Sequence, residues 1–167
     1  EGFLKAIREA RMAQRRIFTA MYVFGGERRT GDLQFYLERF CRYHGLLLIM
    51  VTVDLATDSR WNIECPISFD RMVQMCQGLL DLIFGSPPCA TVSAARHNLA
   101  CAGPRPLRFR WCFWEGRPDL THYEKLRLQA ANACYGNWMC LAELVVKHGG
   151  FFGHEHPADR GVDPYPS

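Results

Sequence analysis

The chain has 167 residues, of which 49% are hydrophobic and 22% are charged. This length and composition fit one globular domain with an apolar core, and they exclude a wholly disordered chain. Lysine and arginine outnumber acidic residues by 20 to 17, and the resulting net charge of +3 permits nucleic-acid binding but excludes a polybasic, histone-like protein.

The sequence contains no apolar run of the roughly 20 residues that a transmembrane helix needs, because the longest run covers only residues 46–51. The first residues, Glu1-Gly2-Phe3-Leu4-Lys5, do not form a secretory signal. Because the chain begins with Glu1 and not with Met, we expect a fragment or a processed chain. We also expect no membrane segment and an intracellular location, with the nucleus as one candidate compartment.

Hydrophobic periodicity predicts helices that alternate with short strands. The predicted elements begin with a helix over 2–14, a strand over 17–24, a helix capped by Asp32 and ended by Gly45, and a strand over 46–53. We then expect an irregular passage over 55–66, a helix over 68–77, a strand over 79–84 and a short helix over 91–97. The chain is expected to end with a loop over 98–118, a helix over 119–148, a strand over 151–153 and an extended tail.

Strands separated by helices predict right-handed crossovers and a parallel sheet. The expected fold class is therefore α/β, with a Rossmann-like, mostly parallel sheet that carries helices on both faces. We divide the chain into an N-terminal helix (1–15), an α/β domain (16–157) and an extended tail (158–167). Ligands of such sheets bind beyond the carboxyl ends of the strands.

The eight cysteines do not predict a zinc site or a disulfide scaffold, because no two of them form the close CxxC pair typical of zinc ligands. We expect reduced thiols that mostly pack as small hydrophobic side chains. His154 and His156 alternate along the last predicted strand, but spacing places no third ligand beside them. We therefore expect no metal.

A glycine-containing loop and an acidic residue follow the first two predicted strands. Gly25 and Gly26 directly follow Phe24, and glycines at this place let backbone N–H groups approach a ligand. Asp54 follows the second strand, where a carboxylate can accept both ribose hydroxyls of a nucleoside. Each feature alone also fits an ordinary tight turn or a helix cap. Together they suggest an adenosine-containing cofactor.

The third predicted strand leads into Gly85-Ser86-Pro87-Pro88-Cys89. Two prolines stiffen this loop and would hold Cys89 in one place. A helix that begins at Thr91 would put the thiol near a helix N-terminus, which stabilises a nucleophilic thiolate. The alternative is a buried structural cysteine beside a Pro-Pro turn.

Glu155 follows the last predicted strand, at the same sheet edge as Cys89. If this carboxyl group is buried, it can retain a proton and act as an acid or as a hydrogen-bond donor to a ring nitrogen. The alternative is a solvated charged turn before Pro157.

Arginines gather in and beside the long predicted loop, and three of them, Arg96, Arg105 and Arg108, are candidates for neutralising nucleic-acid phosphates. The alternative is an ordinary solvated loop.

These motifs resemble a known family. The run Asp81-Leu82-Ile83-Phe84-Gly85-Ser86-Pro87-Pro88-Cys89, followed by Ser93, resembles the nucleophile motif of DNA (cytosine-5) methyltransferases. Phe24-Gly25-Gly26 is similar to their S-adenosylmethionine loop, and Val53-Asp54 to their ribose-binding acidic position. Pro106-Leu107-Arg108-Phe109 and Glu155 resemble later motifs of the same family. The resemblance spans residues 17–157 and keeps the family's motif order.

The resemblance implies a class I methyltransferase-type fold and transfer of a methyl group from S-adenosylmethionine to C5 of cytosine in DNA. It implies that Cys89 adds to C6 of the base and that Glu155 supports protonation at N3. It assigns S-adenosylmethionine binding to five residues, which are Phe24, Gly25, Gly26, Asp54 and Pro87. The target base must leave the DNA stack to be reached.

The sequence also departs from this family. Ala90 follows the cysteine where the family has Gln, and His156-Pro157 follow the glutamate where it has Asn-Val. Residues 158–167 do not resemble the family's target-recognition domain or its later motifs. Two alternatives therefore stand beside the enzyme. One is a non-catalytic module that binds S-adenosylmethionine, a nucleotide or nucleic acid. The other, ranked lowest, is a methyltransferase-type enzyme with another target, such as N4 of cytosine or adenine.

Overall fold

The computed structural model of the protein describes residues 2–91, 105–108 and 112–155. The elements of this part are α1 (Gly2–Met12), β1 (Ile17–Val23), α2 (Leu33–Tyr43), β2 (Leu47–Val53), η1 (Ser59–Trp61), α3 (Pro66–Cys76), β3 (Leu82–Gly85), η2 (Cys89–Thr91), α4 (His122–Lys147) and β4 (Phe151–His154).

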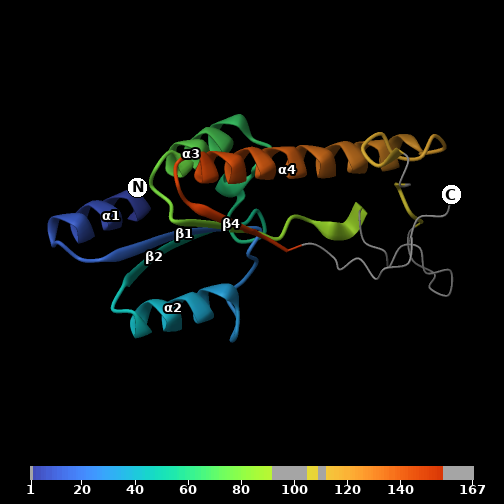
Figure 1. The fold of residues 1–167 in the computed structure, drawn as a ribbon. Helices are drawn as coiled ribbons and strands as arrows, with labels where there is room; N and C mark the ends of the chain where they lie inside the picture. Colours follow the sequence, from blue (N-terminus) through green and yellow to red (C-terminus); the bar gives the residue numbers. More distant parts are fainter. Residues whose placement is uncertain (1, 92–104, 109–111, 156–167) are drawn as a thin grey trace.

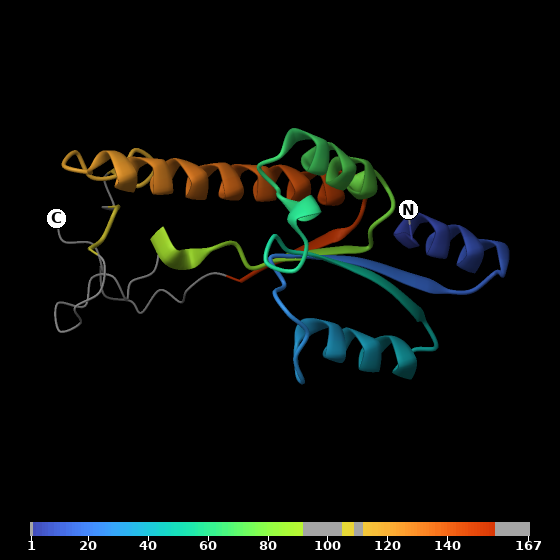
Figure 2. The same ribbon diagram turned by 180° about the vertical axis from the view of Figure 1, so that it is seen from behind.

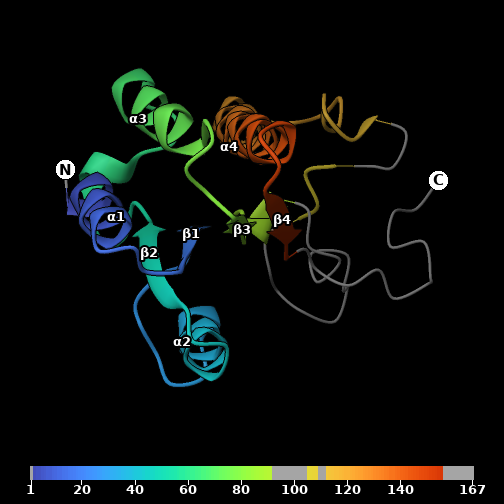
Figure 3. The same cartoon turned by 60° about the vertical axis from the view of Figure 1, so that its left-hand side comes forward.

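The four strands form one all-parallel sheet in the order β2-β1-β3-β4. Helix α2 lies on one face of this sheet, and α3 and α4 lie on the other (Figures 1 and 3). The view from behind shows the same separation of α2 from α3 and α4 (Figure 2). The predicted α/β class and the helices on both faces are therefore confirmed, and the arrangement is consistent with a Rossmann-like sheet.

The chain reverses its direction across the sheet after β2. From β1 it moves to the edge strand β2, and from β2 it returns across β1 to β3. The first crossover helix, α2, and the second, α3, lie on opposite faces, as is required when both crossovers have the same hand. The carboxyl ends of β1 and β3 therefore border a topological switch point, where ligands bind in open α/β sheets.

The main core lies between the sheet and the pair α3 and α4. It is built from alternate strand residues, among them Met21, Val53 and Ile83, and from apolar residues of both helices. Helix α1 adds a smaller cluster, in which Ile7 and Ala10 pack on Ile49 of β2. The predicted N-terminal helix is thus part of the sheet's cover.

Local capping fixes where the helices begin. Asp32 accepts a hydrogen bond from the N–H of Phe35, as predicted from its position before the helix. Helix α4 begins at His122 and not at Asp119, because Thr121 and Glu124 form a reciprocal capping box. Helix α3 begins two residues before the predicted Ser68, since Pro66 is favoured in a first helical turn.

The prediction of a strand over 79–84 is wrong in its first half, because β3 begins at Leu82. Asp81, the residue before β3, bonds to Thr19 of β1 through both its backbone and its side chain. Its N–H donates to the Thr19 carbonyl at 3.0 Å, and its Oδ2 accepts hydrogen bonds from the N–H and the hydroxyl of Thr19, at 2.7 and 2.8 Å. The predicted helix over 91–97 begins within the 3-10 turn η2, and its residues after Thr91 lie outside the described part of the chain.

Trp138 of α4 is fully buried at the centre of the core, and its Nε1 donates a hydrogen bond to Nδ1 of His154 at 3.1 Å. A Cβ atom on Gly85 would lie 2.7 Å from two atoms of the Trp138 ring. The end of β3 therefore needs glycine so that the indole can cover it.

Replacing Gly85 by Ala is expected to destabilise the protein by about 1–3 kcal/mol, since the added methyl group forces the Trp138 ring to move. Urea unfolding measures this change. Gly136→Ala is the matched control, because nothing lies within 4 Å of its Cβ position on α4, and Ala there is expected to stabilise the helix by about 0.5–1 kcal/mol. Equal effects of the two substitutions would contradict the packing described.

Candidate functional site

The loop after β1 is shaped by close backbone contacts. Phe24 has a positive φ of 62°, which is uncommon for a residue with a side chain, and its N–H donates to the Val53 carbonyl at 2.8 Å. A Cβ on Gly25 would lie 2.7 Å from Cγ2 of Thr52. Gly26 also has a positive φ, of 64°, and nothing lies within 4 Å of its Cβ position. The loop thus combines a tight approach to β2 with an open backbone at Gly26.

Asp54 joins this loop to the end of β2. Its Oδ2 accepts a hydrogen bond from the N–H of Gly26 at 2.8 Å, and its Oδ1 accepts one from the N–H of Ala56 at 2.7 Å. A carboxylate oxygen has more than one lone pair, so each oxygen can accept a further bond from a ligand hydroxyl. The structure therefore brings the predicted cofactor residues Phe24, Gly25, Gly26 and Asp54 together.

The loop after β3 carries Pro87 and Cys89. Pro87 is buried, whereas Pro88 and Cys89 are exposed, and Cys89 is the first residue of the turn η2. The alternative of a buried structural cysteine is therefore wrong. Cys89 is one of two exposed free cysteines among the described residues, and the other is Cys140 on α4.

Glu155 continues β4 next to this loop. Its N–H donates to the Gly85 carbonyl at 2.9 Å, and its Oε2 accepts a hydrogen bond from the Ser86 hydroxyl at 2.8 Å. Glu155 is exposed, so this carboxyl group has the solvated position of the alternative and not the burial on which its role as an acid was conditional. Because Ser86 lies three residues before Cys89, the nucleophile loop and the carboxylate meet at one edge of the sheet.

Sequence reasoning missed Ser86 and Tyr22 as site residues. The Tyr22 hydroxyl lies 3.4 Å from Oγ of Ser86, so a polar chain runs from β1 through the β3 loop to Glu155. The strand register explains this chain of polar side chains. Tyr22 pairs with Phe84 and Gly85 pairs with His154. Ser86 and Glu155, which follow these residues, therefore lie side by side on the same face of neighbouring strands.

Arg108 does not face solvent as a phosphate-binding residue would. Its exposed fraction is 1%, and its guanidinium donates to Oγ1 of Thr91 at 3.0 Å and to the Phe113 carbonyl at 2.7 Å. It also lies over the rings of Phe113 and Trp114. Arg108 therefore anchors the turn that contains Cys89, and the alternative of a fully solvated loop is wrong for this segment, where Leu107 is also buried.

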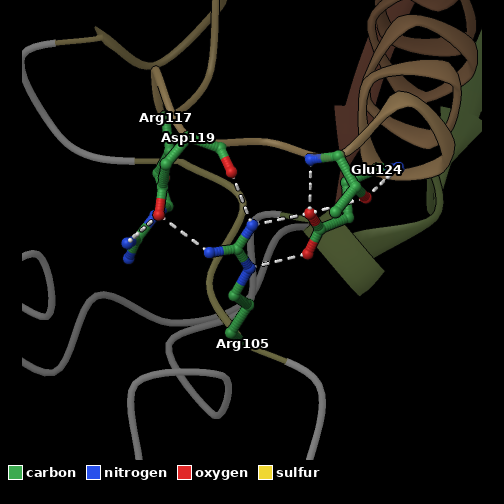
Figure 4. A network of polar contacts seen from close by, with 5 residues as sticks. Arg105, Arg117, Asp119 and Glu124 are labelled. Carbon is green, nitrogen blue, oxygen red and sulfur yellow. Dashed lines mark hydrogen bonds and ion pairs between the residues drawn. The ribbon is translucent and has the colours of Figure 1, made fainter.

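Arg105 lies in an ion-pair network that holds the start of α4 (Figure 4). Its guanidinium donates to both carboxylate oxygens of Glu124, at 2.8 and 2.7 Å, and to Oδ2 of Asp119 at 2.8 Å. Arg117 donates to both oxygens of Asp119. The side chain predicted to bind phosphate thus has two carboxylate partners within the protein. The third candidate, Arg96, lies outside the described residues.

The network shifts the titration of its members. Hydrogen bonding to Arg105 lowers the pKa of Glu124 from 4.5 to about 2, and the bonds that Asp119 accepts, first from Arg117, lower the pKa of that carboxyl group as well. Both carboxylates therefore remain ionised well below neutral pH.

Two hollows on the described surface lie away from this site. One lies at the amino ends of β1 and β3, and the other lies on α2. No group of three or more His, Cys, Asp or Glu side chains that could hold a metal ion occurs among the described residues. Likewise, no described helix has the length and apolar character needed to cross a bilayer.

Comparison of the chain with protein-family models, with curated proteins and with solved structures gives no match.

Replacing Arg105 by Gln is expected to lower the melting temperature above pH 4.5, where Glu124 is ionised in both the folded and the unfolded chain. Because the folded pKa of Glu124 lies below its unfolded value, the stabilisation is lost as the pH falls from 4.5 to about 2. The difference in melting temperature between wild type and variant should therefore shrink over this range.

Arg127→Gln is the matched control, since the contact of Arg127 in the described part of α4 is with the ring of Tyr123 and not with a carboxylate. Its effect on the melting temperature should not change with pH. A pH-independent effect of Arg105→Gln would contradict the role of the network.

Proposed function

We propose that the chain is a divergent catalytic core of an S-adenosylmethionine-dependent DNA (cytosine-5) methyltransferase. The observation that carries this proposal is the hydrogen bond from Ser86 to Glu155, because it joins the loop of the nucleophile candidate to the candidate carboxylate. The order β2-β1-β3-β4 supports it, since it places these loops beside the switch point.

The residues after β1 and β2 fit an adenosine-containing cofactor. Gly26 leaves open space where a side chain would otherwise project, and Asp54 retains acceptor capacity on both carboxylate oxygens. Asp54 would hold the ribose hydroxyls, while Phe24, Gly25, Gly26 and Pro87 would line the site. When bound, S-adenosylmethionine would supply an electrophilic methyl group.

The chain's own residues would then act on the base. The Cys89 thiolate would form a bond with C6 of a cytosine extruded from the stack, and the electron pair of the C5–C6 double bond would become available at C5. Glu155 would hold a proton at N3 and so balance the charge that develops on the ring. After methylation, transfer of the C5 proton to water would restore the double bond and expel Cys89 as a thiolate, and N3 would return its proton to Glu155.

The exposed position of Glu155 has a consequence for this chemistry. A hydrogen bond between a carboxyl group and a ring nitrogen is stronger where water is excluded. Bound cytosine would therefore have to cover Glu155 and exclude water from it. The hydrogen bond from Ser86 fixes one carboxylate oxygen and leaves Oε1 for the ring.

The covalent step is tested with DNA that contains 5-fluorocytosine, incubated with the protein and S-adenosylmethionine. Fluorine at C5 cannot leave as a proton does, so the adduct should remain on the cysteine. Peptide mapping by mass spectrometry is expected to find the adduct on Cys89 and to find none in Cys89→Ser. Cys140→Ser is the matched control because Cys140 is also exposed, and it should retain the adduct.

Calorimetry with S-adenosylmethionine separates the enzyme from the binding module. Asp54→Asn is expected to weaken binding about tenfold or more, because a charged acceptor to the ribose is lost. Binding that depends on Asp54 without any adduct would contradict catalysis and favour a non-catalytic module. The absence of both binding and adduct would contradict both functions.

A further inference from the structure

The outer side of α2 carries three exposed aromatic side chains at helical spacing. Tyr36, Phe40 and Tyr43 have exposed fractions of 61%, 51% and 85%. Residues separated by four and three positions lie on one side of a helix, and at 1.5 Å per residue they are about 6 and 4.5 Å apart along its axis. We call these three side chains the aromatic row of α2.

This side of α2 is not part of the protein's core. Among the described residues α2 is the helix on its face of the sheet, opposite α3 and α4 (Figure 3). Its fully buried residue is Cys41, whereas the aromatic row points away from the sheet. Large exposed apolar side chains grouped on one surface typically mark an interaction site.

The aromatic row is bordered by positive charge. Arg39 and Arg42 are exposed, and within the described residues neither forms an ion pair. Together with Phe40 and Tyr43 they line a shallow hollow. The nearby carboxylates of Asp32 and Glu38 each form an ion pair with Arg28. The surface therefore offers cations and flat apolar rings without a free carboxylate to oppose an anion.

The rings also support one another. His44 lies 4.4 Å from Phe40 and 5.0 Å from Tyr43 between ring centroids, so it links the last two members of the row. Arg39 also lies over the ring of Phe35, the neighbour of Tyr36, and it lines the same hollow as Phe40 and Tyr43. Successive rings with cations alongside are the features that bind unpaired bases by stacking and their phosphates by charge.

We propose that the aromatic row, with Arg39 and Arg42, binds single-stranded nucleic acid. Unpaired bases stack on the exposed rings, and the two guanidiniums neutralise neighbouring phosphates. A duplex fits less well, because its bases are already stacked on one another. This binding does not depend on methyl transfer, since α2 contributes no residue to the chemistry proposed for Cys89 and Glu155.

The test uses a fluorescein-labelled 12-nucleotide oligothymidine and fluorescence anisotropy with the full chain. Phe40→Ala and Tyr43→Ala are each expected to weaken binding about fivefold or more, as the loss of one stacking partner does. Tyr123→Ala is the matched control, because Tyr123 on α4 is 68% exposed and also lies beside an arginine, Arg127. It should bind as wild type does.

The salt dependence tests the arginines. The logarithm of affinity falls with the logarithm of salt concentration, and this negative slope should become less steep by about 0.7 for each phosphate contact removed by Arg39→Gln or Arg42→Gln. The Arg127→Gln control should leave the slope unchanged.

Wild-type affinity in both aromatic variants would overturn the proposal, as would an equal loss in Tyr123→Ala. Displacement of the oligonucleotide by polyglutamate at equal charge concentration would also overturn it, because it would indicate an acidic peptide site without base stacking. The anisotropy measurement contains no S-adenosylmethionine, and oligothymidine contains no cytosine, so a failure of the α2 surface is distinguished from a failure of the methyltransferase proposal.

Discussion

The position of β1 between two parallel neighbours is the constraint on which the rest of the structure depends. Because the chain leaves β1 toward β2 and later returns to β3, the loops that follow these strands meet at one edge of the sheet. The edge is then closed by direct bonds between loops, from Gly26 to Asp54 and from Ser86 to Glu155. Residues separated by up to 69 positions in sequence are thereby joined.

Some residues that pack in or against the core also hold the candidate site in place. Trp138 covers Gly85 from one side of the sheet and donates to His154, the residue before Glu155. Arg108 binds Thr91, two residues after Cys89, from a segment that itself packs on α4 through Leu107 and Leu128. The positions of Cys89 and Glu155 therefore depend on α4, although this helix contributes no residue to the proposed chemistry.

The order of helices and strands could be predicted because each element has a clear periodicity, and the parallel sheet follows from that order. Interactions between residues distant in sequence could not be predicted in this way. The third strand begins at Leu82, after the predicted start, and the Asp81 side chain before it bonds to Thr19, which is 62 positions away in sequence. Arg105 and Arg108 look like free cations in sequence, but their partners Glu124 and Thr91 lie 19 and 17 residues away. The spacing of residues along the sequence indicates local structure, whereas the roles of these three side chains depend on tertiary contacts.

The loops after β3 and β4 meet at Ser86 and Glu155, and a disulfide placed between these two positions tests this contact directly. Neighbouring strands lie about 4.8 Å apart, within the range that a disulfide can bridge. A Ser86→Cys/Glu155→Cys variant, made with Cys89→Ser to prevent exchange, is oxidised mildly and mapped by mass spectrometry. A bridge between positions 86 and 155 is expected in the folded protein and is not expected to form selectively in urea. Failure of these two positions to pair in the folded state would contradict it.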